Sequence, residues 1–198
     1  MRLILASQSA SRKAMLTAAG VRFDAVSADV DEGEIKSYLQ EELSQDASAI
    51  SIALAGAKAS AVSEQFPDAL VLGGDSIIEV EGRLFDKPGS RDEAAEHLRF
   101  FSDKTMNLHS AAVLMRGGKN IGAHSDCAHL DVRPLSETFI ADYLDHEWPA
   151  ISGCVGCFRV EARGVQLFRA ISGNHFTILG MPLLGVLDLL RTQGVLPK

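Results

Sequence analysis

The sequence predicts an α/β fold, in which strands and helices alternate along the chain. Short apolar runs typical of buried strands are separated by longer stretches in which apolar residues recur at helical spacing. The chain has 198 residues and 46% hydrophobic content, which is enough to bury one substantial core. We therefore expect a single domain over residues 1–198, built as one unit or as two closely joined lobes.

The expected elements follow the chain in order. Apolar runs predict strands at 2–6, 69–73, 109–115 and 175–179. Helical spacing predicts helices near 10–19, 47–64, 90–101, 136–144 and 182–192. Gly20 fits the end of the first helix and Pro182 the start of the last, while the Arg-Gly-Gly-Lys run at 116–119 fits a hairpin turn.

The charge balance restricts the possible partners. The chain carries 19 basic and 26 acidic residues, a formal net charge of −7. This is the wrong sign for a protein that covers a nucleic-acid backbone, so we expect no nucleic-acid partner and only a small, locally held polyanion. The opening apolar run, 1–6, is too short for a signal peptide or a membrane span. We expect a cytoplasmic protein with no membrane partner.

Cysteine usage indicates neither a disulfide framework nor a complete metal site. The chain has three cysteines, an odd number. Cys154 and Cys157 have the spacing of half a zinc site or of a redox pair, but no second pair follows and Cys127 stands alone. We expect all three to be ordinary packing residues.

A loop rich in hydroxyl groups connects the first expected strand to the first helix. Ser7, Ser9 and Ser11 are followed by Arg12 and Lys13. A helix start offers free backbone N–H groups and a partial positive charge, so this segment can cradle an anion. Taken alone, it fits an ordinary serine N-cap with solvated basic side chains better. It is not a Walker A loop, because the required glycines and lysine are absent.

A carboxylate stands at the end of the second apolar strand. Two glycines precede Asp75 and allow close backbone approach, so the acid could hold a metal or accept a proton. Residues 77–85 predict a hairpin that returns Lys87 to the same end of the sheet. A strict two-residue turn puts Asp75 and Lys87 on opposite faces, and one bulge residue at Gly82 would put them on the same face. A turn-capping Asp and a solvated Lys explain these residues equally well.

Two further charged segments each have two interpretations. Lys58 lies in the alanine-rich helical stretch 53–59, where it could approach a phosphate, although a lysine in such a place more often extends to water. The acidic run 29–34, which contains Glu32, fits a solvated turn or a metal site equally well.

Together these segments resemble the Maf family of nucleoside triphosphate pyrophosphatases, also called septum formation proteins. The family motifs L-A-S-x-S-P-R-R, E-K-A, G-A-D-T and K-P correspond to residues 5–12, 57–59, 73–76 and 87–88. The closing pattern, I-x-G followed by V-G-L-P-L, corresponds to residues 171–173 and 179–183. Each motif is short, but five in the same order over essentially the whole chain make the resemblance specific.

The resemblance implies a mixed twisted sheet flanked by helices, with two lobes around a central nucleotide cleft, as in Maf and ITPase-like proteins. It implies hydrolysis between the α- and β-phosphates of a nucleotide, which releases a nucleoside monophosphate and pyrophosphate. The implied cofactor is a divalent cation, Mg²⁺ or Mn²⁺, which with basic side chains would neutralise the phosphate oxygens. A homodimer is compatible with these features.

The family's site residues carry over position by position. Asp75 is implied as the catalytic acid or base and as a metal ligand, with Glu32 as a second acid beside the metal. The side chains implied to hold the triphosphate are those of Ser9, Arg12, Lys58 and Lys87, with Lys13 as a substitute for a family arginine that is Ser11 here. Asp103 stands where the family has Gly and Met106 where many members have His, which puts the shape of that loop in doubt.

Residues 154–164 indicate the choice of base. Members that act on dTTP and UTP have A-Y-G-I-Q-G here, whereas the 7-methyl-GTP branch has a pattern near C-A-G-S-F-K-S-E-G-x-G, which this sequence resembles. The carboxylate of Glu161 can accept hydrogen bonds from N1–H and the amine of guanine, and it favours a cationic methylated base. Against this, Ser11 stands where that branch usually has Trp. We expect 7-methyl-GTP as the substrate, with dTTP, UTP or CTP as the alternative.

Two other classes compete with this interpretation. A non-enzymatic cell-division regulator that binds nucleotide would share the same cleft, although Asp75, Lys58 and Lys87 together favour turnover. A sugar-phosphate or other phosphatase would need a D-x-D or C-x₅-R catalytic signature, and neither pattern directly follows an expected strand.

Overall fold

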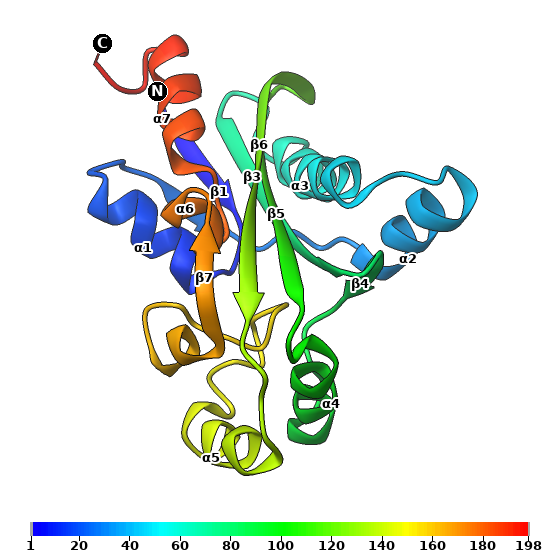
Figure 1. The fold of residues 1–198 in the computed structure, drawn as a ribbon. Helices are drawn as coiled ribbons and strands as arrows, with labels where there is room; N and C mark the ends of the chain where they lie inside the picture. The colour runs from blue at the N-terminus through cyan, green and yellow to red at the C-terminus, as the bar shows by residue number, and fades with distance from the viewer. Residues whose placement is uncertain (1, 198) are drawn as a thin grey trace.

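The computed structural model describes residues 2–197, which form one seven-stranded mixed sheet flanked by helices (Figure 1). The strand order is β2-β1-β3-β5-β6-β7, with β4 paired to β3. The strands are β1 (Leu3–Ala6), β2 (Asp24–Val26), β3 (Leu70–Val80), β4 (Arg83–Phe85), β5 (Thr105–Arg116), β6 (Lys119–Val132) and β7 (Phe168–Ser172). β1 runs parallel to β2 and β3, and the other pairs are antiparallel. The predicted mixed α/β fold is confirmed.

Helices pack against both faces of the sheet (Figure 1). They are α1 (Ala10–Ala18), α2 (Glu32–Ser37), α3 (Ala47–Ser63), α4 (Arg91–Phe101), α5 (Glu137–Glu147), α6 (His175–Ile178) and α7 (Leu183–Thr192). A π-helical turn, Tyr38–Glu42, follows α2, and a 3₁₀ turn, Arg163–Leu167, precedes β7. Within residues 2–197, every helix is too short or too polar to cross a lipid bilayer.

One face of β3 packs closely against α3. Val71 shares a buried cluster with α3, as does Ile77 farther along the strand. Between them, a Cβ placed on Gly73 would lie 2.1 Å from the backbone oxygen of Ala55. A glycine at this position therefore lets the backbone of α3 lie directly on the sheet.

The opposite face of β3 carries two separate cores. Leu70 and Leu72 pack with residues of α1 and α7. Ile78 and Val80, at the other end of the strand, pack with residues of α4 and α5. Successive even-numbered residues of β3 share this face, so the middle of the strand lies between the two cores. The expected two lobes meet at this point.

Most of the elements predicted from periodicity are present. The five predicted helices correspond to α1, α3, α4, α5 and α7, and three of the predicted strands correspond to β1, β3 and β5. The strand predicted at 175–179 is wrong, because these residues form α6 and the turn after it. Asn174 caps this helix by accepting a hydrogen bond from the backbone N–H of Phe176 at 3.0 Å.

The turns also test the predictions. Gly20 ends α1 with a φ of +73°, and Gly117 and Gly118 join β5 to β6 with positive φ, as expected for a hairpin. Asp103 adopts a φ of +59°, the region that favours glycine. The glycine-to-aspartate difference at this position therefore leaves the chain in a left-handed turn, which Arg169 supports by donating to Asp103 Oδ1 at 2.8 Å.

Candidate functional site

The site lies at a gap along one edge of β3. This edge pairs with β1 through Gly73 and with β4 from Ile78 onward, so no described strand pairs with residues 74–77 there. The gap opens into a cleft with a volume of ≈ 920 Å³. Because the strand edge is open, side chains from both faces of β3 reach the cleft, with Asp75 on the α3 side and Ser76 on the other.

Lys58 connects two carboxylates on the α3 side of the cleft. Its Nζ lies 2.6 Å from Asp75 Oδ1 and 2.9 Å from Glu32 Oε1. The side chains of Lys58 and Asp75 are 11% and 8% exposed, whereas that of Glu32 is 46% exposed. Lys58 is thus directed into the cleft rather than along the surface to water, because the close approach at Gly73 places α3 against this part of β3.

Asp75 and Glu32 are the residues that could hold a divalent cation. Carboxylate oxygens are the ligands that Mg²⁺ prefers, and these two converge on one positive group, Lys58. Among the side chains that the structure describes, no cluster of three or more His, Cys, Asp or Glu is arranged to hold a metal. The pair therefore fits a cation whose other ligands are water and substrate phosphate, as is usual for Mg²⁺.

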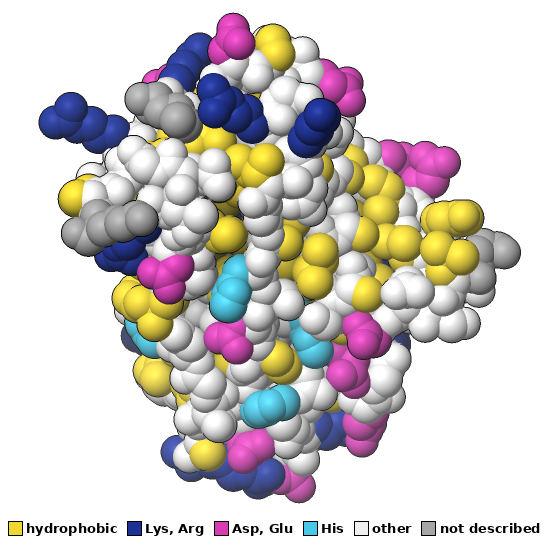
Figure 2. All heavy atoms as spheres, turned by 90° about the horizontal axis from the view of Figure 1, so that it is seen from above, with side chains coloured by type: hydrophobic (Ala, Val, Ile, Leu, Met, Phe, Trp, Pro, Cys, Tyr) yellow, Lys and Arg dark blue, Asp and Glu magenta, His cyan; other side chains and the backbone are white. Residues whose placement is uncertain are grey.

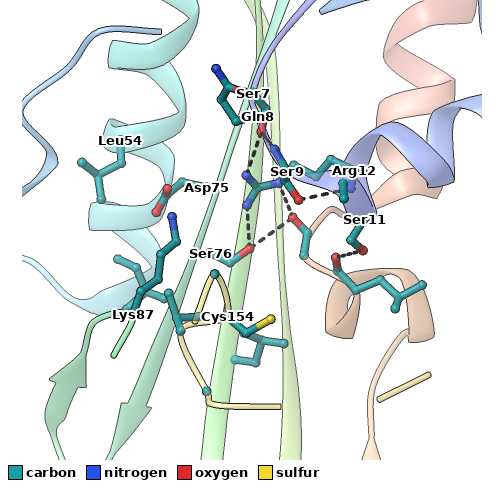
Figure 3. A pocket seen from close by; sticks show the side chains of 18 of the residues that line it. Ser7, Gln8, Ser9, Ser11, Arg12, Leu54, Asp75, Ser76, Lys87 and Cys154 are labelled. Carbon is teal, nitrogen blue, oxygen red and sulfur yellow. Dashed lines mark hydrogen bonds between the residues drawn. The ribbon is translucent and has the colours of Figure 1, made fainter. Parts of the chain in front are cut away.

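Arg12 joins three segments on the other side of the cleft (Figure 3). Its Nε donates to the Gly180 oxygen at 2.7 Å, its Nη1 to Ser7 Oγ at 3.3 Å and its Nη2 to Ser76 Oγ at 3.0 Å. Burial lowers the pKa of Arg12, opposed by the nearby carboxylates of Asp75 and Glu32. A guanidinium stays protonated in proteins, so Arg12 contributes a positive charge and has N–H donors left for a ligand.

The serine loop before α1 serves mainly to shape the backbone. Ser9 caps the helix by accepting a hydrogen bond from Arg12 N at 3.3 Å, and it also lines the cleft. Ser7 Oγ accepts a hydrogen bond from Ser9 N at 3.2 Å. Ser11 donates to the Leu179 oxygen at 2.7 Å, which joins the loop to the chain after α6. Ser9 therefore caps α1, as the N-cap interpretation predicts, and also lines the cleft.

Lys13, expected to replace the family arginine, is not among the residues that line the cleft. Successive residues of an α-helix are rotated by about 100°. With Arg12 directed into the cleft, its neighbour Lys13 is turned away.

Lys87 lines the cleft, although the hairpin has no bulge at Gly82. Val80 pairs with Arg83 and Ile78 with Phe85 across a plain two-residue turn. β4 ends at Phe85, so strict alternation no longer applies at Lys87. Figure 3 shows Lys87 and Asp75 on the same side of the pocket.

The segment expected to contact the base forms another wall of the same cleft. Glu161 lines the cleft and is exposed. Beside it, Arg159 donates from Nε and Nη2 to Oε2 of Glu147 at 3.0 and 2.8 Å, and Glu147 is only 3% exposed. Tyr143 donates to the Cys157 oxygen at 2.9 Å. Helix α5, through Tyr143 and Glu147, thus holds this segment in place.

Two cysteines of this segment have different surroundings. Cys157 lies in the core, and burial raises its pKa to about 12, so its thiol stays protonated near neutrality. Cys154 lines the cleft, and burial raises its pKa as well. Neither has the lowered pKa that is typical of a reactive cysteine.

Sequence reasoning missed two charged residues in the cleft, Lys36 and Asp86, which form an ion pair with each other. Lys36 follows Glu32 by four residues, a spacing that places both on one face of a helix. The acidic run was expected to be a loop, in which this spacing does not place two side chains on one face. Asp86 directly precedes Lys87, and its position alone gave no signal.

Comparisons with known proteins identify the family of this chain. The Maf-like protein family matches residues 2–193. A nucleoside triphosphate pyrophosphatase from Sphingopyxis alaskensis is 43% identical over 199 residues, covering 100% of both chains. A 7-methyl-GTP pyrophosphatase from Bartonella quintana is 42% identical over 194 residues, covering 98% of this chain and 96% of that protein's length. A HAM1 protein structure from Coxiella burnetii gives a TM-score of 0.42 at 16% identity, over 67% of this chain and 73% of that one. The family match along nearly the whole length, together with these identities, shows that this chain belongs to the Maf-like protein family.

Proposed function

We propose that this protein hydrolyses nucleoside triphosphates between the α- and β-phosphates, releasing a nucleoside monophosphate and pyrophosphate. The observation that carries the proposal is that the ion pairs of Lys58 with the Asp75 and Glu32 carboxylates lie in one cleft with the Arg12 guanidinium. The Sphingopyxis alaskensis relative, named as a nucleoside triphosphate pyrophosphatase, supports the same reaction class.

The cleft provides separate groups for charge and for proton transfer. Arg12, Lys58 and Lys87 offset the charge of the triphosphate, which explains how a chain of net charge −7 can hold a polyanion. Asp75 Oδ1 is bound to Lys58, so its other oxygen is the one to accept a proton from water as that water attacks the α-phosphorus. The bond from the α-phosphorus to the bridging oxygen breaks, and pyrophosphate leaves.

A divalent cation is part of the proposal. Bound at Asp75 and Glu32, Mg²⁺ or Mn²⁺ would supply positive charge at the phosphate oxygens. Without it, the two carboxylates would repel the substrate. We expect EDTA to abolish turnover and added Mg²⁺ to restore it, and full activity in EDTA would contradict this role.

The preferred base is proposed to be 7-methylguanine. Glu161 lines the cleft and presents only acceptors, which match the N1–H and amine donors of guanine. The name of the Bartonella quintana relative points the same way. The alternatives within the same reaction are dTTP, UTP and CTP, whose bases offer a different pattern of donors and acceptors.

A nucleotide panel with product analysis tests the proposal. The panel contains 7-methyl-GTP, GTP, dTTP, UTP and CTP, and both products are quantified. We expect equal amounts of monophosphate and pyrophosphate, with the guanine nucleotides turned over fastest. Orthophosphate as the first product would mean that a different bond is cleaved. Binding without turnover of any nucleotide would favour the non-enzymatic regulator.

A further inference from the structure

A lysine outside all the motifs described above lies in the wall of the cleft. Lys36 is on α2, one helical turn after Glu32, and both line the cleft. Its side chain is only 15% exposed, although α2 contributes no fully buried residue to the core. The ammonium group of Lys36 forms an ion pair with Asp86, at the end of β4 beside Lys87.

The partner of Lys36 differs from the partners of the other cleft cations. Lys58 is bound by the largely buried Asp75 and by Glu32, and Arg12 by three oxygens of the protein. Asp86 is 75% exposed. An ion pair with a solvated carboxylate contributes little to stability, so Lys36 can exchange Asp86 for a stronger anion at little cost. Asp86 then returns to water.

We infer that Lys36 is a further triphosphate-binding residue, which Asp86 holds at the cleft until a phosphate replaces it. The inference rests on the proposed function. It gives the cleft a cation that the motifs lack, since Ser11 stands at the family arginine and Lys13 is turned away from the cleft. Helix α2 then has two roles: Glu32 lies with Asp75 beside Lys58, and Lys36 contacts the phosphates.

The alternative is that the ion pair only fastens α2 to the end of β4. The two explanations predict different effects for the two halves of the pair. If the ion pair only holds α2 against β4, Lys36→Met and Asp86→Asn should have equal effects on KM. A phosphate ligand is lost only in Lys36→Met, whereas Asp86→Asn releases the lysine for the substrate.

The experiment compares KM and kcat for the nucleotide preferred by the wild-type protein. Lys36→Met is expected to raise KM about tenfold or more, since a charged hydrogen bond is lost. Asp86→Asn is expected to lower KM, because no ion pair must be broken. Lys104→Met is the matched control: its Nζ lies 3.0 Å from the exposed Glu81, outside the cleft, and KM is expected to stay unchanged.

Binding of inorganic tripolyphosphate, measured by calorimetry, separates this inference from the proposed function. The probe has no base and needs no turnover, so weaker binding by Lys36→Met supports the inference even if no nucleotide is hydrolysed. An unchanged KM and tripolyphosphate affinity in Lys36→Met would overturn it. So would equal losses in Lys36→Met and Asp86→Asn.

Discussion

Asp75 is the residue on which the proposed chemistry depends most directly. It is 6% exposed, it lies at the open edge of β3, and it shares Lys58 with Glu32. Asp75→Asn keeps the size of the side chain but removes the charge and the proton acceptor. We expect kcat to fall by at least about 100-fold. A thermal melt run in parallel must show a folded protein, and activity retained by that folded variant would exclude the role.

Glu161 decides the choice of base in the proposed function. If a bound base covers the Glu161 carboxylate, a pyrimidine carbonyl would place two acceptors opposite each other. This costs roughly 1–3 kcal/mol, which corresponds to a roughly five- to 150-fold preference for guanine. Glu161→Gln should reduce the advantage of 7-methyl-GTP and GTP over UTP and dTTP. Steady-state kinetics on all four substrates measure this ratio. An equal loss on every nucleotide would instead place Glu161 at the phosphate end of the cleft.

Single residues of the site differ in how far the sequence could predict them. Asp75 and Lys58 were identified through family motifs, and the structure shows them 2.6 Å apart. Lys13 was expected in the cleft because of its charge, but helix geometry turns it away. Lys36 was missed because its spacing from Glu32 has meaning only on a helix, and the acidic run 29–34 gave no helical signal.

At the scale of elements, the contact between α3 and β3 positions Lys58. Gly73→Ala would place a methyl group 2.1 Å from the Ala55 oxygen, a backbone atom that cannot rotate away. We expect the free energy of unfolding to fall by about 1–3 kcal/mol or more, and activity to fall as α3 and Lys58 move from Asp75. Urea unfolding and kcat measure the two effects.

Gly56 provides the matched control for this substitution. It lies on α3 itself, and the nearest atom to a Cβ there, outside the backbone of the helix, is the end of the Met115 side chain at 4.0 Å. Gly56→Ala should raise the free energy of unfolding by about 0.5–1 kcal/mol, because alanine favours the helix. If both variants were stabilised, the proposed close packing at Gly73 would be wrong.

Element prediction succeeded where local pattern and tertiary structure agree. The long helices α3 and α4 have clear helical spacing, and each begins with a side-chain cap, at Asp46 and Ser90. The run 175–179 is apolar like a strand, but the Asn174 cap and the turn at Gly180 make it a short helix. β6 was not predicted because its residues are mostly polar or small. It forms a strand because it pairs with β5 and β7, which a local sequence pattern does not show.

At the scale of the whole molecule, basic and acidic side chains are mixed on the surface and in the cleft. On the face seen in Figure 2, acidic side chains lie between basic ones, so the described residues there form no continuous basic surface. The cleft brings together the basic side chains of Arg12, Lys36, Lys58 and Lys87, and it is also lined by the carboxylates of Glu32, Asp75, Asp86 and Glu161. In the proposed function, affinity for a small polyanion therefore depends on where the basic side chains lie within the cleft and not on the net charge of the chain.

The core beneath α4 contains a titratable group, His97. Its ring packs edge-on against Phe85 at 5.2 Å, and its side chain is 13% exposed. Burial lowers the pKa of His97, and Arg83 lowers it further, whereas Glu93, Glu96 and Asp86 oppose the shift. Its Nδ1 also lies 3.6 Å from Cys157 Sγ, next to the segment that carries Glu161. Protonation of His97 therefore opposes packing of this lobe.

Stability should consequently depend on pH in a defined direction. Because the pKa of His97 is lower in the folded chain than the unfolded value of about 6.5, the unfolded chain binds more protons between these two values. The contribution of neutral His97 to the free energy of unfolding is then fully present above about pH 6.5, and it is lost as the pH decreases toward the folded pKa. Urea unfolding at a series of pH values measures this slope. His97→Gln should flatten it. An equal slope in wild type and His97→Gln would assign the acid sensitivity to groups outside this core.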